Sequence, residues 1–259
     1  MAAEPGGRMA GKRVLLTGAS GIGAAAAARL RGEGAEVFVA DKDPERIAAL
    51  CGALPGVVGA AGDLGDEDFA RAAVEEALVT LGGLDVLVNV AGLSGRRFGD
   101  GPVHLASAEG WDAVMWNNLR STFLVCRYGI EPLLRQRRGA IVNTGSVLAY
   151  APAAEHFATH AYAASKGAIH ALTRSMAASY AADGIRVNAV APGLIATRMS
   201  ERAQADPEVL AYLRERQPLT GAPGAPDDVA GAISYLASDE ASFVTGVILE
   251  VSGGWSVAR

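Results

Sequence analysis

The sequence predicts an α/β protein built on one doubly wound parallel sheet of about seven strands, with helices on both faces. Short runs rich in β-branched residues alternate along the chain with longer alanine-rich stretches. Several of the short runs are apolar at every position, such as Val14-Leu15-Leu16 and Val37-Phe38-Val39. Strands of a parallel sheet read in this way because helices bury both of their faces. Alternating strands and helices build a doubly wound sheet.

The expected elements follow one another in a regular order. The strands are predicted at residues 13–17, 36–40, 57–61, 86–90, 140–144, 186–191 and 247–251, and the helices include residues 24–32, 67–81, 111–137 and 162–183. The alanines at 24–28 are strong helix formers. No change of composition and no internal repeat divides the chain. We therefore expect a single domain over residues 11–259, preceded at residues 1–10 by a short disordered leader rich in glycine, proline and alanine.

Bulk composition excludes several classes of function. The formal net charge is -5 and no run of basic residues occurs, which argues against nucleic acid or an anionic membrane as a partner. The two cysteines, Cys51 and Cys126, are far apart and lack metal-ligand spacing. We therefore expect neither a disulfide framework nor a metal site, and a reducing cytoplasm fits best. The chain shows no signal-peptide pattern and no stretch of about 18 apolar residues that would predict a membrane span.

The first expected strand runs directly into the turn Thr17-Gly18-Ala19-Ser20-Gly21-Ile22-Gly23 and then into a helix. Glycines in such a turn let the backbone approach a pyrophosphate closely, and the N-terminus of the helix supplies N–H donors and the positive end of its dipole. Ligands of a doubly wound sheet bind beyond the carboxyl ends of its strands. The turn therefore predicts a dinucleotide site at this edge of the sheet.

The second expected strand leads to Asp41. An acidic side chain at this point accepts hydrogen bonds from the ribose hydroxyls of adenosine and repels a 2′-phosphate, so it favours NAD over NADP. Lys42 is adjacent, and its positive charge would soften that discrimination. In an alternative interpretation, Asp41 caps the helix that begins at Pro44-Glu45.

Small or polar residues also follow other expected strands. Asp63 and Leu64 stand where a carboxylate and an apolar side chain could flank an adenine. The run Asn89-Val90-Ala91-Gly92 offers small residues against which a cofactor could lie flat, and Asn89 can tie neighbouring strands. The rigid turn at residues 192–197 could offer backbone groups to a carboxamide. Each of these segments, taken alone, could equally be an ordinary loop.

Tyr162 and Lys166 stand four residues apart in an expected helix, and this spacing puts them on the same face. A positive charge near a phenol favours phenolate and lowers a pKa that is ordinarily about 10. The pair could therefore exchange a proton near neutral pH. Ser146, after the fifth strand, could hydrogen-bond a substrate oxygen. Alternatively, Tyr162 is a half-buried tyrosine beside a solvated lysine.

Taken in order, these motifs resemble the short-chain dehydrogenase/reductase family, and the resemblance covers residues 11–255. Its motifs here are the Thr-Gly turn, Asp63, Asn89-Val90-Ala91-Gly92, Asn118, Ser146, Tyr162 with Lys166, Pro192-Gly193 and Gly253-Gly254. The resemblance implies a Rossmann-like NAD(P)-binding domain with four catalytic residues. Tyr162 would be the general acid/base, Lys166 would lower its pKa and bind the nicotinamide ribose, Ser146 would polarise the substrate oxygen, and Asn118 would hold a water of a proton relay.

Asn118 is preferred to the adjacent Asn117 because the following run, Leu119-Arg120-Ser121-Thr122-Phe123, matches the family pattern. The expected cofactor-binding residues are Gly18, Ser20, Gly21, Ile22, Asp41, Asp63, Leu64, Asn89, Ala91, Gly92, Tyr162, Lys166, Pro192, Gly193, Ile195 and Thr197. The expected substrate contacts are Ser146, Glu155, His156, Tyr162 and Met199. The family is commonly tetrameric, so a homotetramer is expected.

Three features depart from the family pattern. The glycine turn has only Ala19 and Ser20 between its first two glycines and only one residue before the third, so it is one residue shorter than the family's common patterns. The segment from Ser146 to Tyr162 is about three residues longer than usual, and its extra part, including residues 154–157, is expected to line or cover the substrate site. Ser252 replaces an aspartate that often precedes the late Gly-Gly pair.

The sequence thus predicts an NAD(H)-dependent oxidoreductase that transfers a hydride between nicotinamide and a secondary alcohol or ketone. One alternative is an NADPH-dependent ketoreductase of the 3-oxoacyl type, which Asp41 opposes. Another is a dinucleotide-binding sensor or scaffold with little turnover, which only the shortened turn supports. A lid is expected at residues 196–218 and includes Met199. Arg96 and Arg97 could bind a carboxylate or phosphate, or could lie in a solvated loop.

Overall fold

A seven-stranded, wholly parallel sheet organises the chain, in the strand order β3-β2-β1-β4-β5-β6-β7. We describe residues 7–258 of a computed structural model. The strand order reverses between β1 and β4, because the chain adds β2 and β3 on one side of β1 and then β4 to β7 on the other. At such a point a doubly wound sheet opens a crevice that can bind a ligand. The predicted fold class is confirmed.

Each strand lies within one residue of its predicted limits. The strands are β1 (Arg13–Thr17), β2 (Glu36–Asp41), β3 (Val58–Ala61), β4 (Val86–Asn89), β5 (Gly139–Thr144), β6 (Ile185–Pro192) and β7 (Ile248–Val251). Leu16 of β1 pairs with Val39 of β2 and with Val88 of β4, and all three side chains are fully buried. Apolar runs therefore did mark central strands that are covered on both faces.

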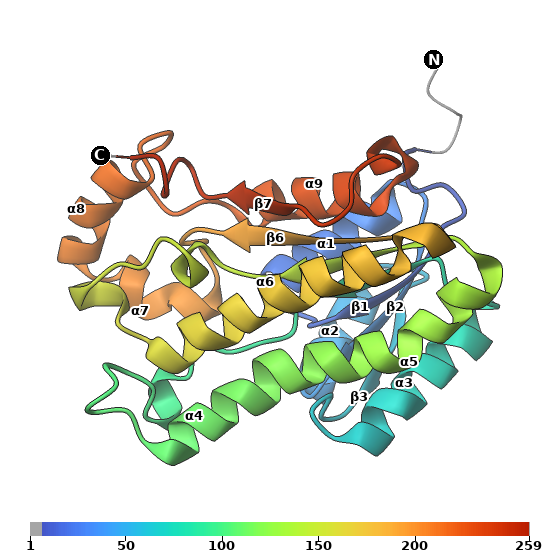
Figure 1. The fold of residues 1–259 in the computed structure, drawn as a ribbon, viewed down its shortest axis with the longest axis horizontal. Helices are drawn as coiled ribbons and strands as arrows, with labels where there is room; N and C mark the ends of the chain where they lie inside the picture. Colours follow the sequence, from blue (N-terminus) through green and yellow to red (C-terminus); the bar gives the residue numbers. More distant parts are fainter. Residues whose placement is uncertain (1–6, 259) are drawn as a thin grey trace.

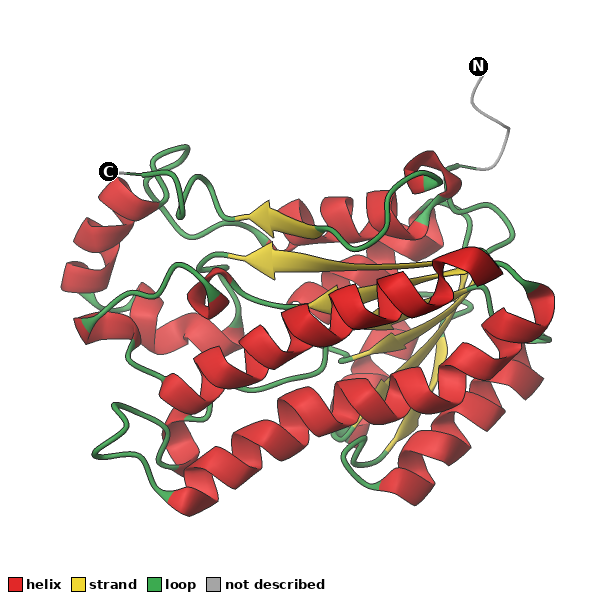
Figure 2. Ribbon diagram, viewed as in Figure 1, coloured by secondary structure: helices red, strands yellow, loops and turns green. Residues whose placement is uncertain are grey.

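Two layers of helices enclose the sheet (Figures 1 and 2). The helices are α1 (Ile22–Gly32), α2 (Pro44–Ala53), α3 (Glu67–Leu81), α4 (Ala108–Val114), α5 (Ser121–Gln136), α6 (His160–Tyr180), α7 (Glu201–Gln204), α8 (Pro207–Arg216) and α9 (Pro226–Ala237). Helices α1, α2 and α9 share one apolar core with Val14 and Leu16, whereas α3, α5 and α6 share the other with Leu15. Successive residues of β1 thus point to opposite layers.

The long helix predicted at residues 111–137 is three consecutive pieces. α4 passes into a wide π-helical turn, Met115–Arg120, and then into α5. Two side-chain hydroxyl groups donate hydrogen bonds to backbone carbonyl oxygens at this turn. Ser121 Oγ donates to Asn117 O over 2.7 Å, and Thr122 Oγ1 donates to Asn118 O over 2.8 Å. A regular apolar periodicity does not reveal such a turn, so the single-helix prediction was wrong in this detail.

Several other boundaries differ from prediction, including the start of α4 at Ala108 rather than at residue 111 and the start of α6 at His160 rather than at residue 162. α1 begins at Ile22 rather than at residue 24, because Gly21 is its N-cap residue. α6 ends at Tyr180 and is followed by a single 3-10 turn, Ala181–Asp183, so the predicted end at residue 183 includes that turn.

The prediction of a disordered leader at residues 1–10 is wrong for residues 7–10. The side chain of Met9 is fully buried in the core that contains α1, and its backbone N–H donates to Glu33 O over 3.0 Å. Residues 7–10 therefore belong to the folded part, while residues 1–6 lie outside the described part of the chain. Within that described part, none of the helices combines the length and the apolar character needed to cross a membrane.

Candidate active site

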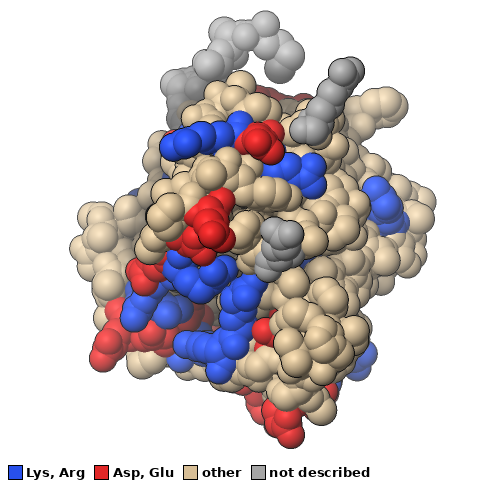
Figure 3. Space-filling view, turned by 90° about the vertical axis from the view of Figure 1, so that its left-hand side faces the viewer, with Lys and Arg blue, Asp and Glu red and all other residues tan. Residues whose placement is uncertain are grey.

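A cavity opens at the carboxyl ends of the strands, where the loops after β1, β2, β4, β5 and β6 meet. This edge is seen face-on in Figure 3, where Lys and Arg side chains gather on the lower half of the face. The predicted site residues that line the cavity are Gly18, Ser20, Gly21, Ile22, Asp41, Asp63, Leu64, Ala91, Gly92, Ser146, Tyr162, Lys166, Pro192, Gly193, Ile195, Thr197 and Met199. Segments far apart in the sequence thus form one continuous wall.

The shortened glycine turn is compact and specifically requires glycine. Gly18 has a φ of +92°, a conformation that side chains rarely adopt, and its missing Cβ would lie 3.2 Å from Ala91 N. A Cβ on Gly23 would lie only 2.0 Å from Gly18 O. The backbone of α1 therefore packs directly onto the turn, which leaves the cavity side of the turn free of side-chain bulk.

Both carboxylate oxygens of Asp41 accept backbone N–H groups. Oδ2 accepts from Ala19 over 2.7 Å and Oδ1 accepts from Asp43 over 2.9 Å. Asp41 is buried, and it does not cap α2, because Asp43 is the N-cap residue. Lys42 and Arg46 line the cavity beside it. This end of the cavity therefore combines one engaged carboxylate with two cations.

Asp63 and Asn89 have their own structural partners. Asp63 accepts from Gly65 N over 2.8 Å and from Trp116 Nε1 over 3.0 Å, while it still lines the cavity. Asn89, predicted as a cofactor contact, lies behind the cavity wall instead. Its Nδ2 donates to Asn143 Oδ1 over 2.9 Å and so ties β4 to β5. The expectation that Asn89 joins neighbouring strands agrees with this contact, whereas its side chain does not reach the cavity.

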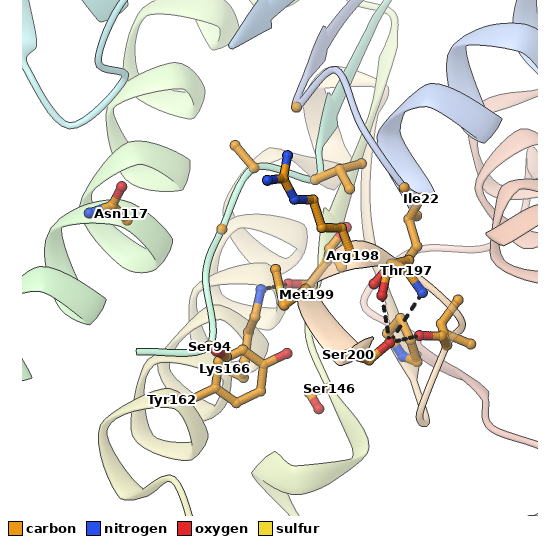
Figure 4. A pocket seen from close by; sticks show the side chains of 18 of the residues that line it. Ile22, Ser94, Asn117, Ser146, Tyr162, Lys166, Thr197, Arg198, Met199 and Ser200 are labelled. Carbon is orange, nitrogen blue, oxygen red and sulfur yellow. Dashed lines mark hydrogen bonds between the residues drawn. The ribbon is translucent and has the colours of Figure 1, made fainter. Parts of the chain in front are cut away.

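Tyr162, Lys166 and Ser146 converge in the cavity (Figure 4). Tyr162 and Lys166 come from adjacent turns of α6, and Ser146 comes from the loop after β5. Lys166 Nζ donates to Thr144 O over 2.7 Å and lies 5.7 Å from the centre of the Tyr162 ring. A phenol, a hydroxyl and an amine therefore stand together at the carboxyl end of the central strands.

Burial controls the protonation of this cluster. It raises the pKa of Tyr162, an effect that the hydrogen bond with Ser146 opposes. It also lowers the pKa of Lys166 to about 8. The lowered tyrosine pKa expected from the spacing is therefore not found, because desolvation of the phenolate outweighs the favourable contacts. The lysine remains the group whose charge is poised near neutral pH.

Asn118 is enclosed between α6 and the loop after β4. Its Nδ2 donates to Leu93 O over 3.0 Å and to Ser165 Oγ over 3.1 Å, and its Oδ1 accepts from Leu93 N over 2.8 Å. Asn117 lines the cavity on its Lys42 side, where its Oδ1 accepts from Lys42 Nζ over 2.9 Å, apart from Tyr162 in Figure 4, whereas Asn118 is not among the lining residues. A Cβ on Gly92 would lie 3.0 Å from Asn118 Oδ1 and 3.6 Å from Lys166 Nζ, so Asn118 and Lys166 flank the same glycine.

The predicted substrate contacts are arranged unevenly. Met199 lines the cavity. His156 does not line it, and its ring lies instead beside Tyr212, with 5.9 Å between the two ring centres. The side chain of Glu155 lies outside the described part of the structure. Arg96 lines the cavity, whereas Arg97 lies over the ring of Phe98. In the expected lid, α7 and α8 follow Met199, and Leu213 is buried in a cluster with Trp255.

His170 is a site-supporting residue that the sequence reasoning missed. It is largely buried, and its Nε2 accepts the backbone N–H of Ser146 over 3.4 Å. Burial, assisted by the positive charge of Lys166, lowers its pKa to about 4, so the imidazole is neutral. The available signal was helical spacing, because Tyr162, Lys166 and His170 recur every four residues on one face of α6.

Comparison with known proteins identifies the family. A family model described as enoyl-(acyl carrier protein) reductase matches residues 17–256. The chain belongs to the short-chain dehydrogenase/reductase family, and it is an oxidoreductase of the class that acts on alcohols and ketones. Relatives in this family are NAD(P)-dependent.

The particular relatives differ in substrate. Inactive 2-(S)-hydroxypropyl-CoM dehydrogenase 2 of Xanthobacter autotrophicus is 42% identical over 85% of this chain and 95% of that protein. 3beta-hydroxysteroid dehydrogenase 1 of Eggerthella lenta is 39% identical over 95% of this chain and 94% of that protein. The solved crystal structure of gox2181 has a TM-score of 0.88 and 31% identity, covering 95% of this chain and 96% of the other.

Proposed function

We propose that the protein is an NAD(H)-dependent oxidoreductase that transfers a hydride between nicotinamide and a secondary alcohol or ketone, with Tyr162 as general acid/base. The observation that carries this proposal is the convergence of Tyr162, Ser146 and Lys166 in one cavity, with Asn118 packed behind them. The name of the Eggerthella lenta relative supports the substrate class, since a 3-hydroxysteroid is a secondary alcohol.

The cavity fits a dinucleotide. It runs from Asp41 past the glycine turn to Tyr162 and Lys166. Its walls contain glycines whose Cβ atoms would collide with backbone or with Asn118. Thr144 Oγ1, at the cavity wall, is a buried oxygen without a hydrogen-bond partner among the described residues. The turn and Thr197 would hold the pyrophosphate side, Asp41 the adenosine ribose, and Lys166 the nicotinamide ribose.

When bound, nicotinamide supplies the acceptor or donor of the hydride. The side chains of this protein supply orientation and proton transfer. In oxidation, Ser146 holds the substrate hydroxyl against Tyr162, and Tyr162 as phenolate takes the hydroxyl proton. Lys166 stabilises that phenolate by its charge. Asn118 fixes the loop of Leu93 and the helix of Ser165, and a relay of its water to Lys166 would return the proton to solvent.

A second candidate is an NADPH-dependent ketoreductase. Its support is the pair of cations, Lys42 and Arg46, at the Asp41 end of the cavity. Asp41 already accepts two backbone N–H groups, which spread part of its negative charge. A 2′-phosphate bound here would be attracted by Lys42 and Arg46 and repelled by Asp41. We favour NAD because the buried carboxylate is hydrogen-bonded to the glycine turn itself, at the position where the adenosine ribose would bind.

The deciding experiment is a fluorescence titration of the purified protein with NADH and, separately, with NADPH, followed by oxidation assays with secondary alcohols. Tighter binding of NADH with alcohol-dependent NADH formation is the expected result. Preference for NADPH would move the ketoreductase to first place. Binding without turnover would favour the sensor or scaffold, a reading that the name of the inactive relative makes worth testing.

The assembly proposed with this function is a cytoplasmic homotetramer. Trp111 of α4 and Phe123 of α5 are each 44% exposed, and we assign them to the surface that would contact another subunit. Both cysteines are free, as a reducing compartment requires. Light scattering that reports a monomer would remove this part of the proposal.

A further inference from the structure

Two arginines from separate segments meet at the mouth of the cavity. Arg96 comes from the short 3-10 turn Arg96–Phe98 after β4, and Arg202 comes from α7. Both donate to the same acceptor, the backbone carbonyl of His156, over 2.7 Å and 3.4 Å respectively. Both line the cavity that contains Tyr162 and Ser146.

The shared acceptor belongs to the segment that is longer than usual in the family. His156 lies in the 3-10 turn Glu155–Phe157, between Ser146 and Tyr162. Among the described residues, the His156 carbonyl is the one acceptor that hydrogen-bonds both guanidinium groups. The insertion therefore assembles the arginine pair, which gives it a role that a mere cover over the site would not need.

Among the described residues, only Arg202 of the two arginines has an ion-pair partner. Among the described residues, Arg96 has no carboxylate within ion-pair distance, and Arg202 is 3.7 Å from Asp206. The nearby Asp100 is engaged with the backbone N–H groups of Ala161 and Tyr162, each at 3.0 Å. Burial, followed by the charge of Arg202, lowers the pKa of Arg96, as expected for like charges held close.

Spare donors remain on both groups. A guanidinium carries five N–H donors, and the hydrogen bonds that Arg96 and Arg202 make to described residues use one each. Two adjacent forks match the oxygens of a carboxylate, sulfonate or phosphate, which guanidinium groups bind through paired hydrogen bonds. Both side chains are exposed to solvent, so an anion that enters the cavity can reach them.

We propose that Arg96 and Arg202 form an anion-binding subsite that selects alcohol or ketone substrates carrying a negatively charged group. This inference rests on the proposed function, and it adds the substrate class. Arg97 is excluded from the subsite, because it does not line the cavity and lies 4.7 Å from the Phe98 ring centre. The neighbouring arginines of the sequence thus have different roles.

The test uses the full-length protein saturated with NADH, and it measures binding of butanoate, propanesulfonate and the neutral butanamide at constant ionic strength. We expect the two anions to bind at least about tenfold more tightly than the amide. Arg96→Met and Arg202→Met should each weaken anion binding by about tenfold or more, while Arg97→Met, the matched control, should not change it. Arg96→Lys, which keeps the charge but loses the fork, should give an intermediate value.

Equal affinity for amide and anions, or an equal loss in Arg97→Met, would overturn the subsite. Competition between the anions and NADH would also overturn it, because the arginines would then serve the cofactor phosphates. Unchanged NADH binding shows that a variant is folded. If the unsubstituted protein binds no NADH, the proposed function fails, and anion binding by the nucleotide-free protein still decides the subsite.

A kinetic measurement extends the test to substrates. For secondary alcohols of equal chain length that end in a carboxylate or in its primary amide, kcat/KM should favour the acid. Arg96→Met and Arg202→Met should remove that preference mainly by raising KM for the acid, with kcat changed little. A preference that survives in both variants would contradict the assignment.

Discussion

The carboxylate of Asp41 accepts the backbone N–H of Ala19 over 2.7 Å, so the residue that would select the cofactor also holds the shortened glycine turn. The turn is one residue shorter than the family pattern, and this bond fixes it to the end of β2. Cofactor choice and turn geometry are therefore coupled through one side chain.

Replacing Asp41 by Ala should relax the preference for NADH. The variant loses a ribose acceptor and a repulsive charge, while Lys42 and Arg46 remain, so the ratio of NADPH to NADH affinity should rise by about tenfold or more. Fluorescence titrations of both nucleotides measure this ratio. Asp66→Ala is the control, because it removes the N-cap of α3 at a residue that does not line the cavity, and it should reduce stability by about 1 kcal/mol without changing the ratio. An unchanged ratio in Asp41→Ala would contradict the assigned role.

Tyr162→Phe should reduce turnover by a factor on the order of 10² or more while NADH binding is largely kept, because only the proton carrier is removed. Steady-state alcohol oxidation and nucleotide titration measure the two effects. Tyr150→Phe is the matched control, since the Tyr150 hydroxyl donates to Glu250 over 2.9 Å, away from the Ser146–Tyr162 pair. Near-normal turnover of Tyr162→Phe would refute the general acid/base assignment.

His170 should make folding sensitive to acid. The unfolded chain takes up a proton near the ordinary pKa of 6.5, whereas folding lowers the pKa of His170 to about 4. The neutral imidazole therefore contributes to the free energy of unfolding in full above about pH 6.5, and this stability is lost as the pH falls toward 4. Its magnitude is on the order of 3 kcal/mol at most. Denaturant unfolding across this range should show a steeper loss in the unsubstituted protein than in His170→Gln. His104→Gln, at an exposed site, should keep the steep loss; identical curves for all three would exclude the effect.

Gly145 and His170 should be energetically coupled. A Cβ on Gly145 would lie 1.9 Å from His170 Nε2, so Gly145→Ala must displace the imidazole and should destabilise the protein by about 1–3 kcal/mol. In a His170→Ala background that penalty should largely disappear. A double-mutant cycle on unfolding free energies measures the coupling. Additive penalties would mean that the clash is relieved elsewhere.

The sheet was predictable because its strands carry their own signal. Val14-Leu15-Leu16 and the similar runs are apolar at each position, and both faces of these strands are indeed buried. The candidate catalytic residues could also be predicted from the sequence, because Tyr162 and Lys166 are four residues apart on one helix and Ser146 follows the end of a strand. Spacing along the sequence was sufficient to predict which residues lie together wherever they belong to the same helix or strand.

Contacts between distant segments were not predictable. Arg96 and Arg97 are equivalent in the sequence, and only the turn after β4 decides which one lines the cavity. Asn89 stands at the end of β4, where a residue that contacts the ligand is expected, but its side-chain amide donates to Asn143 on the neighbouring strand. Spacing alone suggested a lowered pKa for Tyr162, whereas the burial that raises it depends on the whole fold.

The wide turn at Met115–Arg120 has an evolutionary consequence. A π-helical turn holds one residue more than a regular turn, and each residue of an α-helix adds about 100° of rotation. Because the wide turn absorbs the extra residue, deleting one residue there would restore regular winding and keep α4 and α5 nearly in phase, but it would change the direction of the Asn118 side chain, which would no longer face Leu93 and Ser165. We therefore expect this segment to tolerate exchanges of its exposed side chains far better than changes of its length, so its length is inherited more strictly than its composition.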